Sequence, residues 1–326
     1  MGSVSNRLDT LLEGGVRALV GPTASGKSAL ALAVAEAAGA ELVSLDSMLV
    51  YRGMDVGTAK PDPAERARVR HHLLDLVAPN EEFDVARFQA ELVRALEDAT
   101  ARNARVLFVG GTGFYLKVLL ERMFEGPDVD RALRARLEAR VASEGNAALH
   151  AELARVDAAS AARIHANDTK RVVRALEVFE QTGRALSEWQ REWSSFGATS
   201  AGRARTLVGL ALDVPELDRR IAERTRAMLD LGWAEEALAI ERSCGFSKTS
   251  LQALGYREAL ELAHGRATRA ETEAKIALAT RQFARRQRTW YRKFPETTWL
   301  AAAEPGESAS AEAARVRAVL RALDWT

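Results

Sequence analysis

The sequence predicts an α/β protein with a P-loop NTPase-like parallel sheet core and a helical insertion domain. Short apolar runs alternate with stretches of helical periodicity in the first part of the chain, which is typical of a parallel sheet covered on both faces. A glycine-rich loop follows the first apolar run, and a long helical stretch interrupts the alternation before strand patterning returns. We therefore expect residues 1–125 and 203–326 to form the core with C-terminal helices, and residues 126–202 to form the insertion domain.

The elements of the first part are predicted in order from run length and apolar spacing. The run VRALV at 16–20 is a strand, and an alanine- and leucine-rich helix follows from Lys27 to about Ala38. The run AELVSLD at 40–46 is predicted to be a buried strand that ends in Asp46. A helix at 83–104, a strand at 105–111 and a helix at 114–123 follow.

The second part begins with a span rich in Ala, Arg and Glu, residues 131–190, which contains no strand candidate and is predicted to be almost wholly helical. The stretch SSFGATSAGRA at 194–204 consists mainly of small residues and is predicted to be a linker. The run at 205–215 returns the chain to the sheet. Helices over 216–294, a strand at 297–302 and a closing helix from about 310 complete the core.

Composition bounds the class of protein. The 326 residues are 47% hydrophobic and 28% charged, as is ordinary for a soluble globular chain. Cys244 is the single cysteine, no apolar run reaches the length of a membrane span and no leader opens the chain, so we expect a cytoplasmic protein without a membrane partner. These observations do not determine the oligomeric state, for which we expect a monomer. The formal net charge is +1, so a nucleic-acid partner would require locally clustered charge.

The stretch GPTASGKSALA at 21–31 has the G-x-x-x-x-G-K-S spacing of a phosphate-binding loop between strand and helix. Glycines permit the backbone angles that aim successive N–H groups at one anion, and the helix N-terminus adds positive potential. Lys27 supplies a mobile charge, and the Ser28 hydroxyl suits a phosphate-bound Mg²⁺, directly or through water. An ordinary glycine turn is the alternative. The diphosphate-binding residues of the loop are Gly21, Pro22, Thr23, Ala24, Ser25, Gly26, Lys27 and Ser28.

Two further segments end strands where parallel sheets bind ligands. Asp46 ends its strand close in sequence to the loop, where it could hold Mg²⁺ through water or accept a proton. Its alternative role is a helix N-cap. In the segment 110–113, glycines leave room for a ligand and Thr112 offers one hydroxyl, although a simple strand-to-helix turn has the same pattern. The missing acid at this strand argues against ATP hydrolysis.

The helix 271–294 indicates a polyanionic partner. Four of its arginines fall within about 60° on a helical wheel and form a ridge about 16 Å long. We call this the arginine ridge, and it consists of Arg281, Arg285, Arg288 and Arg292. The opposite, apolar side is predicted to be buried and consists of Ile276, Phe283, Trp290 and Phe294. A solvated, salt-bridged face is the alternative.

Two smaller basic clusters accompany the ridge. Lys170, Arg171 and Arg174 lie at a helix start, where the dipole also favours anions. Arg220 and Arg224 share a helix face at i, i+4. Such a pair is usually solvent-exposed and binds no ligand, but it could also bind a diphosphate from the side opposite the loop.

At this point the sequence resembles the bacterial tRNA dimethylallyltransferase family, also called tRNA isopentenyltransferase. The most specific block is D-S-x-x-x-Y-x-G-M-D-x-G-T-A-K-P at 46–61, and Ala166 departs from a frequent family proline. The stretches that carry the resemblance are GPTASGKSALA (21–31), LDSMLVYRGMDVGTAKP (45–61), VGGTGFYL (109–116), IHANDTKRVVRALEV (164–178), LGYRE (254–258) and RQFARRQRTWYR (281–292).

The resemblance implies transfer of a dimethylallyl group from dimethylallyl diphosphate to N6 of the adenosine 3′-adjacent to the anticodon, with Mg²⁺ as cofactor and release of diphosphate. Asp46 would be the general base, and Thr112 would hydrogen-bond the same amine. The leaving diphosphate would be stabilised by Lys27, Ser28, Arg220 and Arg224. The tRNA, bound through its anticodon stem-loop, would contact Asp46, Ser47, Met48, Leu49, Thr112, Arg134, Lys170, Arg171, Val172, Val173, Arg174, Gln252, Gly255, Tyr256, Arg257, Arg281, Gln282, Arg285, Arg286 and Arg288.

Two other classes of protein stay open from the residues alone. A small-molecule P-loop kinase would bind and hydrolyse ATP, and it would have a compact lid rather than a long helical insertion. An RNA-binding module whose loop only senses a nucleotide would transfer no carbon.

Overall fold

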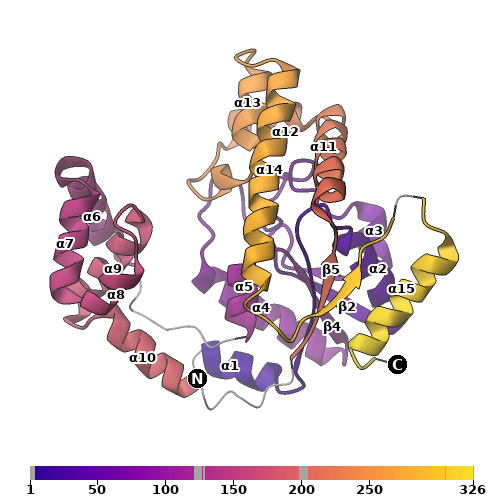
Figure 1. Ribbon diagram of the computed structural model, residues 1–326, viewed down its shortest axis with the longest axis horizontal. Helices are drawn as coiled ribbons and strands as arrows, with labels where there is room; N and C mark the ends of the chain where they lie inside the picture. The colour runs from indigo at the N-terminus through magenta and orange to yellow at the C-terminus, as the bar shows by residue number, and fades with distance from the viewer. Residues whose placement is uncertain (1–3, 121–126, 128, 198–204, 305, 326) are drawn as a thin grey trace. The chain divides into compact units, whose positions relative to one another are not determined.

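The protein divides into two compact units, residues 1–120 with 203–326, and residues 121–202. The computed structural model describes residues 4–120, 127, 129–197, 205–304 and 306–325 (Figure 1). The observed division lies close to the boundaries that the sequence predicts, 125/126 and 202/203. The first unit holds the sheet, and the described part of the second unit consists of helices and short connections without a strand.

The first unit is built on a six-stranded sheet with the order β3-β2-β4-β1-β5-β6, in which every pair of neighbours is parallel. This confirms the predicted parallel sheet. The central strand β1 lies between β4 and β5, and β4 separates β1 from β2. Consequently the segments that leave the carboxyl ends of β1, β4 and β2 are neighbours. The strands are β1 (Val16–Val20), β2 (Ala40–Ser44), β3 (His71–His72), β4 (Arg105–Gly110), β5 (Arg205–Ala211) and β6 (Thr298–Ala301).

Helices α2 and α15 share one hydrophobic cluster with the sheet, in which Val34 and Val319 pack with Leu19, Leu107 and Val208. Because both faces of a parallel sheet need cover, these strands are apolar along most of their length. The helices of this unit are α1 (Val4–Leu11), α2 (Lys27–Ala38), α3 (Pro63–Arg68), α4 (Val85–Ala101), α5 (Gly113–Leu120), α11 (Val214–Asp230), α12 (Trp233–Ser243), α13 (Tyr256–Ala263), α14 (Arg269–Tyr291) and α15 (Ala309–Ala322), with a short 3₁₀ turn η1 (Ser250–Gln252).

The second unit has its own apolar core, in which Leu137, Leu149, Leu153 and Leu176 are all buried. An aspartate caps the start of three of its helices, as the preference for Asp at N-caps predicts. Its helices are α6 (Arg131–Glu144), α7 (Asn146–Val156), α8 (Ala158–Arg163), α9 (Thr169–Thr182) and α10 (Leu186–Gly197). The predicted linker at 194–204 is wrong over its first residues because α10 continues to Gly197, and its remainder lies outside the described residues.

Several predicted boundaries shift for local physical reasons. The strand predicted at 40–46 ends at Ser44, because the Ser44 hydroxyl and the Asp46 carboxylate accept backbone N–H groups and turn the chain. The span 216–294 is broken into several helices, and Gly232 and Gly255 adopt left-handed angles at two of the breaks. The short strand β3 was not predicted, since two histidines carry no strand periodicity.

Candidate active site

The phosphate loop connects β1 to α2 and takes the conformation that its glycines permit. Gly26 caps α2 at a φ of 84°, in the left-handed region. A β-carbon on Gly21 would lie 2.9 Å from the Ser25 hydroxyl oxygen, so the Ser25 side chain leaves little room for any residue larger than glycine at this position. The Ser25 hydroxyl is buried and finds no hydrogen-bond partner among the described residues. The loop therefore holds a polar group with unused hydrogen-bonding capacity.

Lys27, Arg224 and Asp46 interact electrostatically beside this loop. Burial and the nearby Arg224 guanidinium lower the Lys27 pKa from 10.5 to about 8, and the Asp46 carboxylate opposes that shift. Burial also lowers the pKa of Arg224, again against the attraction of Asp46. The Lys27 ammonium donates one hydrogen bond to the Pro22 carbonyl oxygen at 3.2 Å. Two cations thus share this site with a single carboxylate, which is an arrangement suited to an anionic ligand.

The segments after β2 and β4 are joined by hydrogen bonds at the same sheet edge. The Thr112 N–H donates to the Leu45 carbonyl oxygen at 3.1 Å, and the Ser47 N–H donates to the Thr112 hydroxyl oxygen at 3.3 Å. Oδ1 of Asp46 accepts the Met48 N–H at 2.9 Å. No helix follows Asp46 directly, so the alternative role of a helix N-cap is wrong. The carboxylate and the hydroxyl are instead held by adjacent, mutually bonded segments.

Helix α14 fastens the phosphate loop to the segment after β4 through two buried side chains. The Gln287 amide donates to the Gly111 carbonyl oxygen at 2.8 Å and accepts the Thr23 N–H at 2.9 Å. The Tyr291 hydroxyl donates to the Gly21 carbonyl oxygen at 3.3 Å. Sequence reasoning missed both residues. The sequence did offer one indication: on the helical wheel Gln287 falls close to the apolar side, where a polar side chain suggests a buried hydrogen bond.

These contacts also correct the predicted burial of α14. Ile276 and Phe294 are buried as predicted, but Phe283 and Trp290 are only partly buried. The buried side is centred nearer to Ala284, because Gln287 and Tyr291 turn toward the loops they bind. A prediction from apolar residues alone therefore misplaces the buried face.

The helix predicted at 271–294 ends at Tyr291, so the arginine ridge covers one surface of α14 and its C-cap residue Arg292, and this surface is positive. Arg285 and Arg292 are exposed, whereas Arg281 and Arg288 are partly buried. Within the described residues, none of the four pairs with a carboxylate. The alternative of a salt-bridged face is therefore not supported there. Arg286, outside the ridge, lies over the Phe283 ring at 5.9 Å.

The two arginines of α11 have different surroundings. Arg224 interacts electrostatically with both Lys27 and Asp46, as described above. Arg220 instead donates to Glu216 at 2.7 Å and to the Ala303 carbonyl oxygen. The structure thus brings only Arg224 into electrostatic contact with the site, and a diphosphate contact from Arg220 stays a prediction.

Several predicted RNA contacts have side chains that are engaged or buried. In the second unit, Arg134 and Arg174 donate to the buried Glu177 at 2.5 and 2.9 Å, and Val172 and Val173 are buried. Arg171 pairs with Asp168 at 3.2 Å.

In the first unit, Tyr256 is fully buried, so its side chain has no surface to offer an RNA. The Gln252 amide donates to the Lys248 carbonyl oxygen at 2.7 Å, and Arg257 donates to the Leu251 carbonyl oxygen at 3.3 Å. Gln282 is exposed, and the segment 47–49 is partly buried. Their RNA contacts stay predictions.

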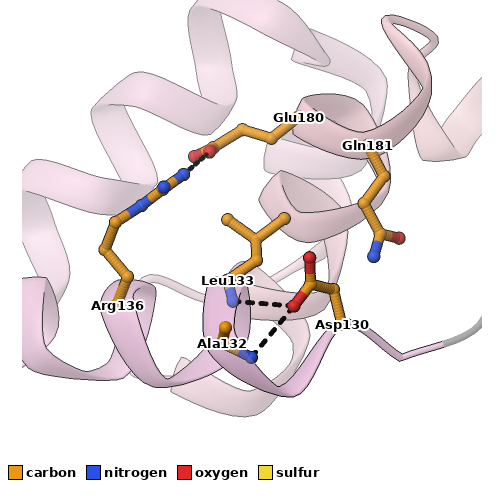
Figure 2. Close-up of a pocket in the computed structure, with 6 residues that line it drawn as sticks. All are labelled: Asp130, Ala132, Leu133, Arg136, Glu180 and Gln181. Carbon is orange, nitrogen blue, oxygen red and sulfur yellow. Dashed lines mark hydrogen bonds and ion pairs between the residues drawn. The ribbon is translucent and has the colours of Figure 1, made fainter.

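A hollow of about 300 Å³ lies in the second unit at the start of α6 (Figure 2). Arg136 and Glu180 pair across it, and Asp130 caps α6 by accepting the N–H groups of Ala132 and Leu133. None of the predicted site residues lines this hollow. The chemistry proposed below therefore rests on the sheet edge of the first unit.

Comparison with known proteins connects this arrangement to one family. Residues 49–294 match the family described as IPP transferase. The tRNA dimethylallyltransferase of Methylococcus capsulatus is 47% identical over 304 residues, which cover 93% of this chain and 96% of that protein. The tRNA dimethylallyltransferase of Symbiobacterium thermophilum is 47% identical over 284 residues, covering 86% and 88%.

Solved structures give the same result. The tRNA isopentenylpyrophosphate transferase of Bacillus halodurans is 32% identical with a TM-score of 0.67, over 95% of this chain and 97% of that one. A eukaryotic dimethylallyltransferase acting on tRNA is 25% identical with a TM-score of 0.75, over 91% and 77%. Among the helices that the structure describes, none has the length and apolarity needed to cross a membrane.

Proposed function

The chain belongs to the IPP transferase family, and we propose that it transfers the dimethylallyl group of dimethylallyl diphosphate to N6 of the adenosine 3′-adjacent to the anticodon of tRNA. The observation that carries this proposal is the electrostatic interaction of Lys27 in the phosphate loop with Arg224 and with Asp46, whose neighbour Ser47 is hydrogen-bonded to Thr112. The two cations suit a departing diphosphate. The carboxylate suits an amine that loses a proton.

The phosphate loop and Lys27 stabilise the negative charge of the leaving diphosphate in this proposal. An allylic diphosphate is a good electrophile only if the charge on the departing oxygen is neutralised as the C–O bond breaks. Backbone N–H groups of the loop, the α2 N-terminus and the Lys27 ammonium are fixed donors for that charge. The Ser25 hydroxyl, which has no partner among the residues that the structure describes, adds another donor in the same loop.

Asp46 and Thr112 act on the amine. The lone pair of an exocyclic adenine amine is delocalised into the ring, so the amine is a weak nucleophile unless its proton leaves as the N–C bond forms. The Met48 N–H holds one oxygen of the Asp46 carboxylate, and the other has no hydrogen-bond partner within the described residues. That oxygen takes the proton in this proposal. The Thr112 hydroxyl orients the amine beside it.

Magnesium fits the donors present at the loop. Ser28 lies in the first turn of α2 and is exposed, and hydroxyl and carboxylate oxygens are donors that Mg²⁺ accepts. No cluster of three or more His, Cys, Asp or Glu side chains suited to a metal occurs among the described residues, so the diphosphate oxygens would complete the coordination. When bound, Mg²⁺ supplies charge neutralisation to the diphosphate. We propose Ser28 as its protein ligand, directly or through water.

The tRNA lies along the arginine ridge in this proposal. The guanidinium groups of Arg285 and Arg288, which pair with no carboxylate in the described part of the chain, suit the phosphates of the anticodon stem-loop. The target adenine leaves its stack to reach Asp46, as required of enzymes that modify a base in a structured nucleic acid. We assign the reaction to a monomer in the cytoplasm.

One incubation tests this function against the two other classes. Purified protein is mixed with dimethylallyl diphosphate that is labelled in the prenyl group, with total tRNA and Mg²⁺, and without ATP. Label should appear in the tRNA, because only a diphosphate is released. In a parallel incubation with ATP, hydrolysis of ATP without label in the tRNA would favour a kinase, and tRNA binding without transfer of label would favour a binding module.

A further inference from the structure

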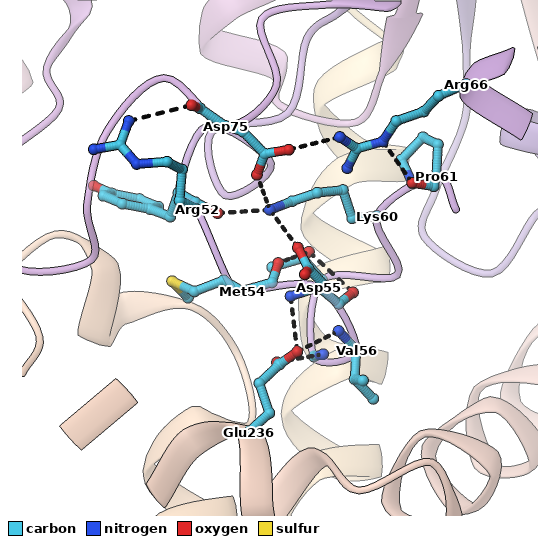
Figure 3. A network of polar contacts seen from close by, with 12 residues as sticks. Arg52, Met54, Asp55, Val56, Lys60, Pro61, Arg66, Asp75 and Glu236 are labelled. Carbon is cyan, nitrogen blue, oxygen red and sulfur yellow. Dashed lines mark hydrogen bonds and ion pairs between the residues drawn. The ribbon is translucent and has the colours of Figure 1, made fainter. Parts of the chain in front are cut away.

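Glu236, on α12, joins two segments that are remote in sequence. Its carboxylate accepts the N–H groups of Asp55 at 2.9 Å, Val56 at 2.7 Å and Gly57 at 3.1 Å (Figure 3). It also accepts the Tyr256 hydroxyl at 2.6 Å. One side chain thus binds both the loop that follows Asp46 and the start of α13. Neither sequence patterning nor the resemblance singled out Glu236.

The bonding requires a carboxylate in particular. Three successive backbone N–H groups form an anion-binding nest, and a carboxylate is an acceptor with about four lone-pair positions on two oxygens. All four contacts to Glu236 come from donors. Hydrogen bonds to an ionised acceptor are roughly twice as strong as those between neutral groups. An amide at this position would place two donor hydrogens against N–H or O–H groups.

Trp233, one turn before Glu236, packs between glycines of the same two segments. A β-carbon on Gly57 would lie 2.0 Å from the indole nitrogen, and one on Gly255 would lie 2.2 Å from the far edge of the ring. Both glycines are therefore required by direct contact with the indole. Trp233 and Glu236 together hold the segments 55–57 and 255–256 against α12.

The loop held by Glu236 is itself anchored by a buried lysine. The Lys60 side chain is fully buried, and its ammonium donates to the Tyr51 carbonyl oxygen, Asp55 and Asp75 at 2.6, 2.7 and 2.6 Å (Figure 3). The Tyr51 hydroxyl in turn donates to Thr249 at 3.0 Å, just before η1. The chain between Asp46 and Lys60 is thus tied down at several points.

We propose that Glu236 is a positioning residue that fixes the loop after Asp46 against the segment 252–257, so that tRNA meets both as one surface. The proposal rests on the proposed function and on the RNA contacts that the resemblance implies for residues 47–49 and 252–257. It extends that function, because the Glu236 carboxylate is bound by four donors of the protein itself and is assigned no substrate contact. Its removal should therefore impair tRNA binding far more than binding of the prenyl donor.

Glu236→Gln and Tyr256→Phe test the proposal, with Glu235→Gln as a matched control. Glu235 is the preceding residue of the same helix, and it is exposed. For Glu236→Gln we expect the KM for tRNA to rise about tenfold, since two of the four donors that bind this carboxylate lose their acceptor, while the KM for dimethylallyl diphosphate stays within about twofold. Tyr256→Phe removes one hydrogen bond without altering charge and should raise the same KM by about threefold. Glu235→Gln should match the wild type.

The readouts separate positioning from general damage and from failure of the proposed function. A merely structural role would lower the melting temperature and the active fraction, hence kcat, and leave the KM for tRNA unchanged in both variants. That result would overturn the proposal. If Glu236→Gln does not fold, Tyr256→Phe alone tests the proposal. A rise of about threefold in its KM for tRNA would support a positioning role, and an unchanged KM would overturn it. If wild-type protein and Glu235→Gln transfer no prenyl group to tRNA, the proposed function fails, and with it the premise of this inference.

Discussion

Replacing Lys27 by Met should stabilise the ligand-free protein at neutral pH, although Lys27 belongs to the phosphate loop. Burial, together with Arg224, lowers the Lys27 pKa from 10.5 to about 8, so keeping it charged costs about 3 kcal/mol of folding free energy. Methionine keeps a similar length without the charge, but it loses the hydrogen bond to the Pro22 carbonyl oxygen, worth about 1 kcal/mol. We expect Lys27→Met to raise the free energy of unfolding by about 2 kcal/mol at about pH 7.

The pH dependence has a definite sign. The folded protein releases the Lys27 proton near pH 8, whereas the unfolded chain keeps it to about pH 10.5. The unfolded state therefore binds more protons between these values, and wild-type stability rises with pH there. Lys27→Met lacks this rise, so its advantage over the wild type should shrink as the pH increases from about 8 to about 10.

Urea unfolding of both proteins at about pH 7 and about pH 9.5 measures this difference. Lys293→Met serves as the control, because Lys293 is an exposed lysine of the same unit. It should change stability by no more than about 0.5 kcal/mol at either pH. A Lys27→Met variant that is less stable than the wild type at about pH 7, or whose advantage does not shrink at higher pH, would refute the electrostatic account of the site.

Two further predictions concern α14. Arg285→Ala and Arg288→Ala should each lower the slope of log K against log salt for tRNA binding by roughly 1 and leave the KM for the prenyl donor unchanged, with Arg317→Ala, an exposed arginine of α15, as control. Slopes equal to that of the control would show that the arginine ridge binds no phosphate. Gln287→Met should cost about 3 kcal/mol of stability, because the part-buried Thr23 N–H and the Gly111 carbonyl oxygen lose their partner, and should raise the KM for the donor. Thermal or urea unfolding and donor kinetics measure both effects, and unchanged donor kinetics would contradict the assignment.

The parts of the site that the sequence predicts are those set by short-range geometry. The phosphate loop depends on glycines and on a helix start within a few residues of one another, and both features can be recognised in the sequence of residues 21–28. Asp46 and Thr112 were predicted to lie at one edge, because parallel strands present their carboxyl ends together. Their mutual hydrogen bonding through the Ser47 N–H follows from that placement.

The parts that it does not predict are contacts between remote segments. Gln287 binds Thr23 across 264 positions, and no local pattern marks that pairing. The same contact turns α14 away from the orientation that its apolar residues suggest. Glu236 and its partner loop are separated by about 180 positions, so the fit of that carboxylate into three N–H groups appears only in the folded chain.

The most direct test of the central claim is prenyl transfer by Asp46→Ala, measured together with tRNA affinity. With saturating dimethylallyl diphosphate and bound tRNA, the rate of transfer should fall by at least about 100-fold, since a general base typically contributes 10²–10⁴-fold. The Kd for tRNA should stay within about threefold of the wild-type value, because the arginine ridge is untouched. A variant that keeps a tenth or more of the wild-type turnover would contradict the assignment of Asp46 as the base.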